Sequence, residues 1–392
     1  MRLGDCCKTN LHTYSDKEKW SLIRYLDTGS ITEGRIDEIQ TLYPGVDKIP
    51  SRARRKASVG DILFSTVRPN QKHYGIIEAG TENLLVSTGF TVVTVDTTIA
   101  DPYFIYYYLT QSSVIESLQA IAEQSTSTYP SIKPSDIEDI ELDLPELETQ
   151  KKIGSTLRML DRKIALNEEI NDNLEQQAQA IYHERFETVS PNDLPSDWRI
   201  VTLGEVATIS NKSFNPLKEP EILLEHYSIP AFDEARFPVF ELSTSIKSNK
   251  FIIDASCFMI SKLNPTTKRV WKPYCLTGNA VCSTEFIVYK AKDQSITDFL
   301  YSVIDSGSFS DFMCSHVTGS TGSRQRTTPS DTLSYELILP SEDELAEFQS
   351  LVSPMYAQMR INAIENDKLK RLRDSLLPKL MSGEIDVSSV HL

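Results

Sequence analysis

Three polar loops in the first half of the chain carry side chains that suit hydrogen bonding to nucleic acids. Residues 51–56 contain four cations, residues 68–73 have the order Arg-Pro-Asn-Gln-Lys-His, and residues 125–133 are rich in Ser and Thr. Arg, Asn, Gln and Lys donate hydrogen bonds to base edges, whereas Ser, Thr and backbone N–H groups hold phosphates. These loops predict contacts with double-stranded DNA, although a solvated polar surface would explain any single loop equally well.

The second half of the chain has loops of the same type in the corresponding places. Residues 262–269 take the place of residues 68–73, which follow a predicted strand. Residues 319–328 take the place of residues 125–133. This recurrence favours a nucleic-acid surface over chance. The candidate DNA-facing residues are Arg68, Asn70, Lys72, Tyr129, Lys262, Asn264, Lys268, Arg324 and Arg326. The candidate phosphate contacts are Arg52, Arg54, Arg55 and Lys56, and His73, Lys133 and Arg269 are further candidate DNA contacts.

Motifs for catalysis by the chain itself are weak. Residues 101–104, Asp-Pro-Tyr-Phe, lack the second proline of the adenine methyltransferase motif, so we interpret them as a turn from a strand into a helix. Residues 319–323 lack the lysine of a nucleotide-binding P-loop. The six histidines and six cysteines show no spacing typical of metal ligands or of a disulfide framework. We therefore expect no catalytic residue, metal or cofactor in this chain.

The sequence is a tandem repeat with a shift of 195 to 201 residues. The matching segments are Leu3-Gly4-Asp5 with Leu203-Gly204-Glu205, residues 87–90 with 283–286, 134–136 with 329–331, and 144–145 with 339–340. Short runs rich in β-branched and aromatic residues, bounded by Gly, Pro and Asn, predict strands in the first part of each half, and helical stretches are predicted at 103–122 and 296–312. Each half therefore begins with a mixed α+β globule.

Each half ends in a long predicted helix with an apolar heptad seam. Residues 148–186 contain no proline and one glycine, which gives a helix roughly 58 Å long. Residues 348–380 repeat the seam, with Pro354 expected to kink the helix and Gly383 to end it. The seam is interrupted by asparagines at the same places in both copies: Asn167, Asn171, Asn362 and Asn366.

We predict that the two helices form an antiparallel coiled coil in which Asn167 faces Asn366 and Asn171 faces Asn362. Such buried polar pairs fix register, although exposed and merely tolerated asparagines are the alternative. The predicted architecture is two similar α+β domains, 1–144 and 188–340, separated by helices at 145–187 and 341–392. A stiff spacer between two similar domains suits half-sites on DNA about one turn, roughly 34 Å, apart.

Composition limits these interpretations. The chain has 392 residues, with 40% hydrophobic and 24% charged residues, as is typical of a globular protein. No apolar run is long enough to span a membrane, and the first 20 residues lack the core of a signal peptide, so we expect a cytoplasmic protein. The net charge of −15 is unusual for a DNA-binding protein, so we expect modest, salt-dependent affinity in the isolated chain and additional contacts from partner proteins.

The chain resembles the specificity subunits of type I restriction–modification systems over nearly its whole length. The segments that carry the resemblance are residues 50–55, 60–70, 144–150 and 372–385, of which the last closely resembles the C-terminal conserved helix of the family. The resemblance implies two target-recognition domains joined by two antiparallel conserved helices. One departure is that residues 259–265 replace the first half's residues 64–70, which weakens individual residue assignments.

The resemblance also implies function and partners. Each recognition domain would read one half of a bipartite, asymmetric DNA target. Two modification subunits would bind S-adenosylmethionine for N6-adenine methylation, and restriction subunits would use ATP and Mg²⁺ for translocation and cleavage. We expect the modification subunits to bind the exposed sides of the two helices. The alternatives are a coiled-coil scaffold without base-specific reading and a self-contained DNA enzyme.

Overall fold

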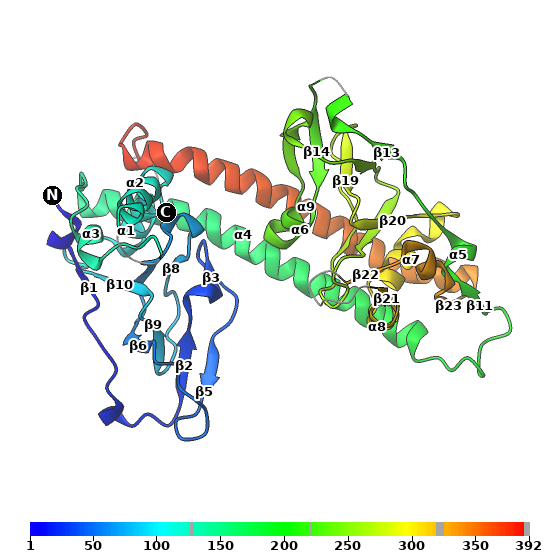
Figure 1. Cartoon of the computed structure of the whole chain (residues 1–392), viewed down its shortest axis with the longest axis horizontal. Helices are drawn as coiled ribbons and strands as arrows, with labels where there is room; N and C mark the ends of the chain where they lie inside the picture. The colour runs from blue at the N-terminus through cyan, green and yellow to red at the C-terminus, as the bar shows by residue number, and fades with distance from the viewer. Residues whose placement is uncertain (126–128, 219–220, 319–324, 388–392) are drawn as a thin grey trace. The chain divides into compact units, whose positions relative to one another are not determined.

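We describe the fold from a computed structural model of the chain (Figure 1). The described residues are 1–125, 129–218, 221–318 and 325–387. The chain divides into two compact units: Met1–Lys163 with Leu369–Leu392 form the first unit, and Ile164–Lys368 form the second. Within the described ranges, no helix has the length and apolar character needed to cross a membrane.

The first unit contains two four-stranded sheets that share no strand. One sheet has the order β1-β10-β7-β8, and the other has the order β5-β2-β9-β6, in which β2 and β9 are parallel. The bounds are β1 Cys7–Thr9, β2 Ile23–Leu26, β5 Gln40–Leu42, β6 Ala53–Lys56, β7 Ile62–Ser65, β8 Tyr74–Ile76, β9 Leu84–Ser87 and β10 Phe90–Val95, with a small hairpin of β3 Ile31–Thr32 and β4 Arg35–Ile36.

The second unit repeats this topology. Its sheet β12-β20-β17-β18 corresponds to the first unit's β1-β10-β7-β8, and its sheet β13-β16-β19-β14-β15 corresponds to β6-β9-β2-β5 with one added edge strand. The parallel pair recurs as β14 and β19. The bounds are β12 Ala207–Ile209, β13 Ser213–Phe214, β14 Leu223–Tyr227, β15 Val239–Leu242, β16 Lys250–Ile252, β17 Cys257–Ser261, β18 Val270–Trp271, β19 Ala280–Ser283 and β20 Phe286–Ala291. Four further strands form two small sheets: β11 Arg199–Thr202 pairs with β23 Glu336–Leu339, and β21 Val317–Thr318 pairs with β22 Arg326–Thr327. The internal repeat predicted from the sequence is confirmed.

One inner strand in each of the sheets β1-β10-β7-β8 and β12-β20-β17-β18 is buried on both faces, which explains its unbroken apolar sequence. In β7, Ile62 and Phe64 pack into one core cluster and Leu63 into another. In β17, Phe258 packs into one core cluster and Met259 into another. These strands therefore hold the segments that follow them on a rigid base.

The helical stretches predicted at 103–122 and 296–312 are each two helices, which corrects the sequence interpretation. They are α1 Pro102–Leu109 and α2 Ser112–Glu123 in the first unit, and α7 Thr297–Ile304 and α8 Gly307–Ser315 in the second, as Figure 1 shows. The Oγ of Ser306 accepts a hydrogen bond from the Phe309 N–H and caps α8. The remaining short helices are α3 Pro134–Glu138, α5 Leu203–Val206 and α6 Ile229–Ala235. A capping residue therefore begins the second helix in the second unit, whereas α2 follows Gln111 without a side-chain cap.

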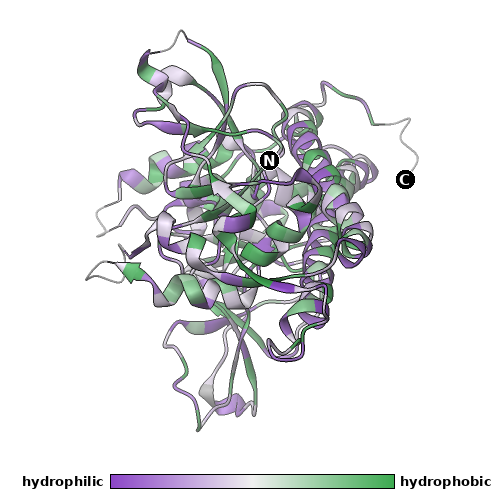
Figure 2. Cartoon of the chain, turned by 90° about the vertical axis from the view of Figure 1, so that its right-hand side faces the viewer, coloured by the Kyte–Doolittle hydropathy of each residue, from purple (hydrophilic) through white to green (hydrophobic). Residues whose placement is uncertain are grey.

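The two long helices are α4 Leu147–Tyr182 and α9 Glu342–Met381. The predicted seam of α4 lies inward: Ile153 and Leu157 join the core of the first unit, whereas Ala178 joins that of the second. Helix α9 continues through Pro354 and ends just before Gly383, which has a φ of +72°. Hydrophilic and hydrophobic positions alternate along the helices in Figure 2, as expected when one face packs inward.

Candidate nucleic-acid interface

The first loop cluster comprises residues 66–73, 87–90 and 129–132. Main-chain hydrogen bonds tie the three segments together: Thr66 N donates to Gly89 O (2.8 Å), Arg68 N donates to Pro130 O (2.9 Å), and Ile132 N donates to Thr66 O (2.9 Å). These bonds involve no side chain. The loop after β7 is therefore held by the turn between β9 and β10 and by the segment that precedes α3.

The second loop cluster comprises residues 262–269, 283–286 and 325–327, and it has the same main-chain bonds. Lys262 N donates to Glu285 O (2.9 Å), Asn264 N donates to Gln325 O (2.9 Å), and Thr327 N donates to Lys262 O (3.1 Å). Each donor and acceptor is displaced by 195 or 196 residues from its counterpart in the first cluster. Both clusters therefore have one backbone frame on which different side chains are mounted.

The loop conformation also recurs. Arg68 and Asn264 occupy equivalent positions, and both have a φ of +48°, in the left-handed region. Asparagine tolerates this conformation readily, whereas an arginine requires support from its surroundings. Main-chain bonds on both sides supply that support, so the side chain at this position leaves the loop in a fixed direction.

In the first cluster the candidate side chains are exposed and gathered in one place. The guanidinium carbon of Arg68 lies 5.2 Å from the centre of the exposed Tyr129 ring. Asn70 is exposed, and Lys72 pairs with Glu33 (Nζ–Oε1 2.5 Å). These groups can donate hydrogen bonds and offer an aromatic face to DNA.

Two candidates next to the first cluster have different surroundings. The Nδ1 of His73 lies 2.7 Å from Ile31 O, and the ring is half-buried, which suits a structural role. Lys133 is exposed and immediately precedes α3. Lys133 is therefore the more accessible of the two.

The basic strand β6 lies beside the first cluster. Arg52 is exposed, and its carbonyl accepts a hydrogen bond from Thr88 N (2.9 Å), in the same turn that holds the loop after β7. Lys56 pairs with Glu18 (2.5 Å), and Arg54 is half-buried. Burial lowers the pKa of Arg55, whose Nη1 has no hydrogen-bond partner among the described residues.

In the second cluster, carboxylates hold most of the candidate cations. Arg326 forms two hydrogen bonds with Glu285, from Nε to Oε2 (3.0 Å) and from Nη2 to Oε1 (3.2 Å). Arg269 makes two bonds to Asp233, and only 14% of its side chain is exposed. Lys262 and Asn264 are half-buried, and Arg324 lies outside the described residues.

Lys268 is exposed and is paired with a buried carboxyl group. Its Nζ lies 2.8 Å from Asp305 Oδ1 and donates to the backbone oxygen of Asp305 (2.8 Å). Burial raises the pKa of Asp305 to about 6, although the Lys268 charge opposes this. An exposed cation above a buried acid can contact a phosphate without leaving its counter-ion.

Sequence reasoning missed the carboxylates that hold these cations. Glu33, Asp233, Glu285 and Asp305 all come from segments other than the loops that they support. A signal existed for Glu285, because residues 283–286 align with 87–90 and Glu285 stands where the first half has Gly89. The other three carboxylates are too far along the sequence from the cations that they bind to form a local pattern.

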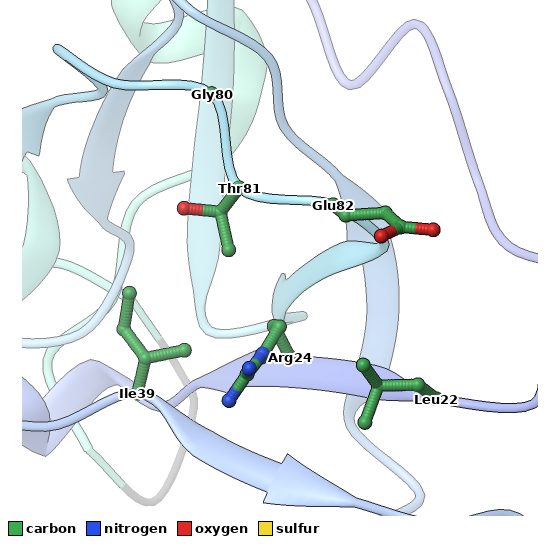
Figure 3. A pocket seen from close by; sticks show the side chains of 6 residues that line it. All are labelled: Leu22, Arg24, Ile39, Gly80, Thr81 and Glu82. Carbon is green, nitrogen blue, oxygen red and sulfur yellow. The ribbon is translucent and has the colours of Figure 1, made fainter.

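The hollows of the first unit do not resemble catalytic sites. One, of about 320 Å³, is lined by Leu22, Arg24, Ile39, Gly80, Thr81 and Glu82, and Figure 3 shows Arg24 between Leu22 and Ile39. Arg24 donates a hydrogen bond to Thr41. A second, of about 440 Å³, contains Tyr14, Trp20 and Arg54 in its lining. Among the described residues, no three His, Cys, Asp or Glu side chains come together as a metal site.

The candidate methyltransferase motif is a helix cap. The Asp101 carboxylate accepts a hydrogen bond from Phe104 N (2.9 Å), and Pro102 is the first residue of α1. This is the turn into a helix that the sequence predicts. The single glycine of α4, Gly154, packs against this cap, because an added Cβ would lie 2.6 Å from Asp101 Oδ1.

The seam asparagines of the second unit are hydrogen-bonded across the two long helices. Asn167 is fully buried, and its Nδ2 donates to Asn366 Oδ1 (2.8 Å) and to Glu365 Oε2 (2.7 Å). Asn366 Nδ2 in turn donates to Ile164 O (3.2 Å). Each buried amide of this pair therefore has a partner on the facing helix.

A second pair of bonds repeats the first with the helices exchanged. Asn362 Nδ2 donates to Asn171 Oδ1 (2.9 Å), and Asn171 Nδ2 donates to Met359 O (3.3 Å). A shift of 195 residues converts the Asn167–Asn366 and Asn366–Ile164 bonds into their counterparts in the second pair, whereas the bond to Glu365 has none. The contacts are those that the antiparallel arrangement predicts, and their role in fixing register stays a prediction.

Comparison with known proteins indicates which family the chain resembles. The family model of the type I restriction modification DNA specificity domain matches residues 48–176. The type I restriction enzyme HindI specificity subunit of Haemophilus influenzae is 24% identical and is aligned over 98% of both chains. This chain is similar to type I restriction specificity subunits over almost its whole length.

Two further similarities are to proteins of the same kind. The MjaIX specificity subunit of Methanocaldococcus jannaschii is 24% identical over 84% of this chain and 79% of its own length. The crystal structure of a type I restriction–modification S subunit from M. genitalium shares the fold, with a TM-score of 0.57 and 16% identity over 97% of this chain and 95% of the other. The predicted fold class, two α+β domains with a helical spacer, is confirmed.

Proposed function

We propose that this chain is a specificity subunit that reads a bipartite, asymmetric double-stranded DNA target, one half with each loop cluster. The family is the non-catalytic DNA-recognition component of type I restriction–modification systems. The observation that supports a bipartite target is the backbone frame that occurs twice with different side chains. Equal frames place side chains in equivalent positions, and unequal side chains select different bases.

The chemistry of the clusters supports base reading in addition to phosphate binding. Arg68 and Arg326 both stand on segments fixed by main-chain hydrogen bonds, and a fixed guanidinium can bond two acceptors on one base edge. Arg52 and Lys268 are exposed cations at the margins of the clusters, which suits contacts with phosphates. Base contacts select the sequence, whereas the marginal cations supply affinity that falls with salt.

A domain exchange tests this function. Residues 1–144 are replaced by the corresponding domain of another specificity subunit, and the hybrid is produced with its modification subunits. Methylome sequencing should then show a change in one half of the modified sequence while the other half is unchanged. The reciprocal exchange of residues 188–340 is the matched control. Methylation without sequence preference, or a footprint without a preferred site, would favour a scaffold instead.

We also propose that two modification subunits bind this chain, one at each copy of the repeat, and that restriction subunits join the assembly. The bound modification subunits supply S-adenosylmethionine, and the restriction subunits use ATP and Mg²⁺. Leu166 on α4 and Ile361 on α9 are 195 residues apart, and their side chains are 50% and 56% exposed. Exposed apolar residues at equivalent positions on the long helices suit two equivalent partners.

Native mass spectrometry tests this stoichiometry. Leu166→Lys should lower the number of bound modification subunits from two to one, Ile361→Lys should do the same, and the double variant should bind none. Ala165→Lys is the control, because it places the same charge on an exposed neighbour about 100° around α4. Unchanged stoichiometry in the double variant would place the modification subunits elsewhere.

A further inference from the structure

Arg326 and Glu285 form a fixed pair in the second loop cluster. Their two hydrogen bonds use the Nε and Nη2 hydrogens on one edge of the guanidinium. The two hydrogens of Nη1 and the second hydrogen of Nη2 remain for other acceptors. The side chain of Arg326 is 42% exposed, and that of Glu285 is 29% exposed. The pair is therefore accessible, and its orientation is set by the carboxylate.

The backbone on both sides of this pair is held in place. Arg326 lies in β22, which pairs with β21, and it forms a bridge with Leu263 of the loop after β17. Thr318 Oγ1 also donates to Arg326 O (3.0 Å). Glu285 accepts the main-chain bond from Lys262 at its carbonyl, and its N–H donates to Ser283 Oγ (3.2 Å). Little conformational freedom remains for the guanidinium to lose on binding.

The first cluster lacks this pair although it has the same frame. Gly89 occupies the position of Glu285, and Ser131 occupies that of Arg326. Its arginine is instead Arg68, at the position of Asn264, and it lies against Tyr129. The frame therefore does not require the ion pair for folding, and the pair is a property of the second cluster.

We propose that Arg326 reads a guanine in the second half of the target and that Glu285 is its positioning residue. Guanine presents two acceptors, O6 and N7, in the major groove, and a planar guanidinium bonds both. Glu285 also offsets the positive charge of Arg326, so the pair gains little from a phosphate. This inference rests on the proposed DNA-reading function and adds the base and the two residues.

The pair predicts a salt dependence that differs from that of a phosphate contact. Removal of a phosphate-binding cation lowers the slope of log affinity against log salt by about 1 and weakens all sequences evenly. Arg326→Ala should instead leave that slope nearly unchanged and weaken only the cognate sequence. Glu285→Gln should release the charge of Arg326, which raises affinity for unrelated DNA and lowers discrimination. A merely structural role for Glu285 would not raise that affinity.

The decisive measurement uses the full chain assembled with its modification subunits and a duplex that carries the methylome-defined target. Each guanine of the second half is replaced in turn by 7-deazaguanine, which lacks the N7 acceptor. The wild-type complex should lose about 5- to 150-fold in affinity at one position. Arg326→Ala should bind normal and 7-deaza duplexes equally at that position. Asp254→Asn is the matched control for Glu285→Gln, because it removes a carboxylate that pairs with a cation outside the second loop cluster, Lys290 of β20 (2.5 Å).

The outcomes separate this inference from the proposed function. If the wild-type complex binds all sequences alike, the DNA-reading function itself fails. If the wild-type complex is selective but Arg326→Ala weakens cognate and unrelated DNA evenly, the function stands and the guanine assignment is wrong. A selective complex that tolerates 7-deazaguanine at every position of the second half overturns the assignment in the same way.

Discussion

Replacement of Asn167 by alanine tests whether the asparagine network stabilises the paired helices. The substitution removes hydrogen bonds to Asn366 Oδ1 and Glu365 Oε2, each worth about 1 kcal/mol. It also leaves the Oδ1 of Asn366, whose side chain is 6% exposed, without this partner, at a further cost of about 1–3 kcal/mol. The expected loss in the free energy of opening is therefore about 3–5 kcal/mol.

The second asparagine pair, Asn362 and Asn171, provides a comparison within the same protein. Asn362→Ala removes the equivalent bond to Asn171 Oδ1, but Asn171 is only half-buried and its oxygen can bond to water. We expect a smaller loss, about 1–2 kcal/mol, from the same chemical change. Asn362→Ala also removes the acceptor for the Nε2 of the exposed Gln358, so the difference between the two variants combines the effect of burial with that of unequal partners.

Native-state hydrogen exchange of the amides in α4 is the appropriate assay, because a chain with two units need not unfold in a single transition. Asn173→Ala is the control. Asn173 is exposed, and its side chain donates a hydrogen bond to Glu169 O of its own helix. This variant reports the gain in helix propensity, about 0.5 kcal/mol. A variant at Asn167 that opens no more readily than Asn173→Ala, or Asn362→Ala with the larger loss, would refute the reasoning.

Three further predictions concern separate parts of the molecule. Gly154→Ala should lower the free energy of unfolding by about 1–3 kcal/mol in a urea titration, because its Cβ would displace the Asp101 cap; a gain in stability, as is usual for glycine to alanine in a helix, would contradict this packing. Asp305 has a pKa of about 6 when folded against 3.8 when free, so its contribution to stability falls as the pH rises from about 4 to about 6. Between pH 4 and pH 8, the free energy of unfolding of Asp305→Asn should therefore rise by up to about 3 kcal/mol relative to that of the wild type, as measured in parallel denaturant titrations. A difference between the two proteins that does not vary with pH would count against the burial of this charge. Tyr129→Ala should weaken binding to the cognate duplex in fluorescence anisotropy through loss of the aromatic support for Arg68, whereas an unchanged affinity would place that side chain off the DNA.

The features that follow a local period could be predicted from the sequence. The seam of α4 and α9, the facing asparagines and the turn at Asp101 all depend on spacings within a few turns of one helix. The domain repeat was visible because matching segments keep a nearly constant shift. The interruption of the predicted helix at residues 110–111 was missed, because no glycine or proline marks the break and Gln111 is not a typical capping residue.

The interactions that assemble the loop clusters could not be predicted in this way. Arg68 bonds to Pro130 through the main chain, and main-chain bonds leave no residue type to recognise. Glu285 lies 41 residues before Arg326, so their pairing depends on how β20 and β22 are placed by the fold. The candidate cations were therefore identified by type, whereas the carboxylates that restrain them became evident only in three dimensions.

The shared backbone frame has an evolutionary consequence. Its bonds join main-chain atoms only, and the positions of Gly89 and Ser131 in one copy hold Glu285 and Arg326 in the other. Substitutions at these sites therefore alter the chemistry presented to a ligand without removing a main-chain bond of the frame, although a side chain at Gly89 would require Thr28 to shift. A lineage that carries such a scaffold can acquire a new target through a few point mutations, while folding and assembly with its partners are inherited unchanged.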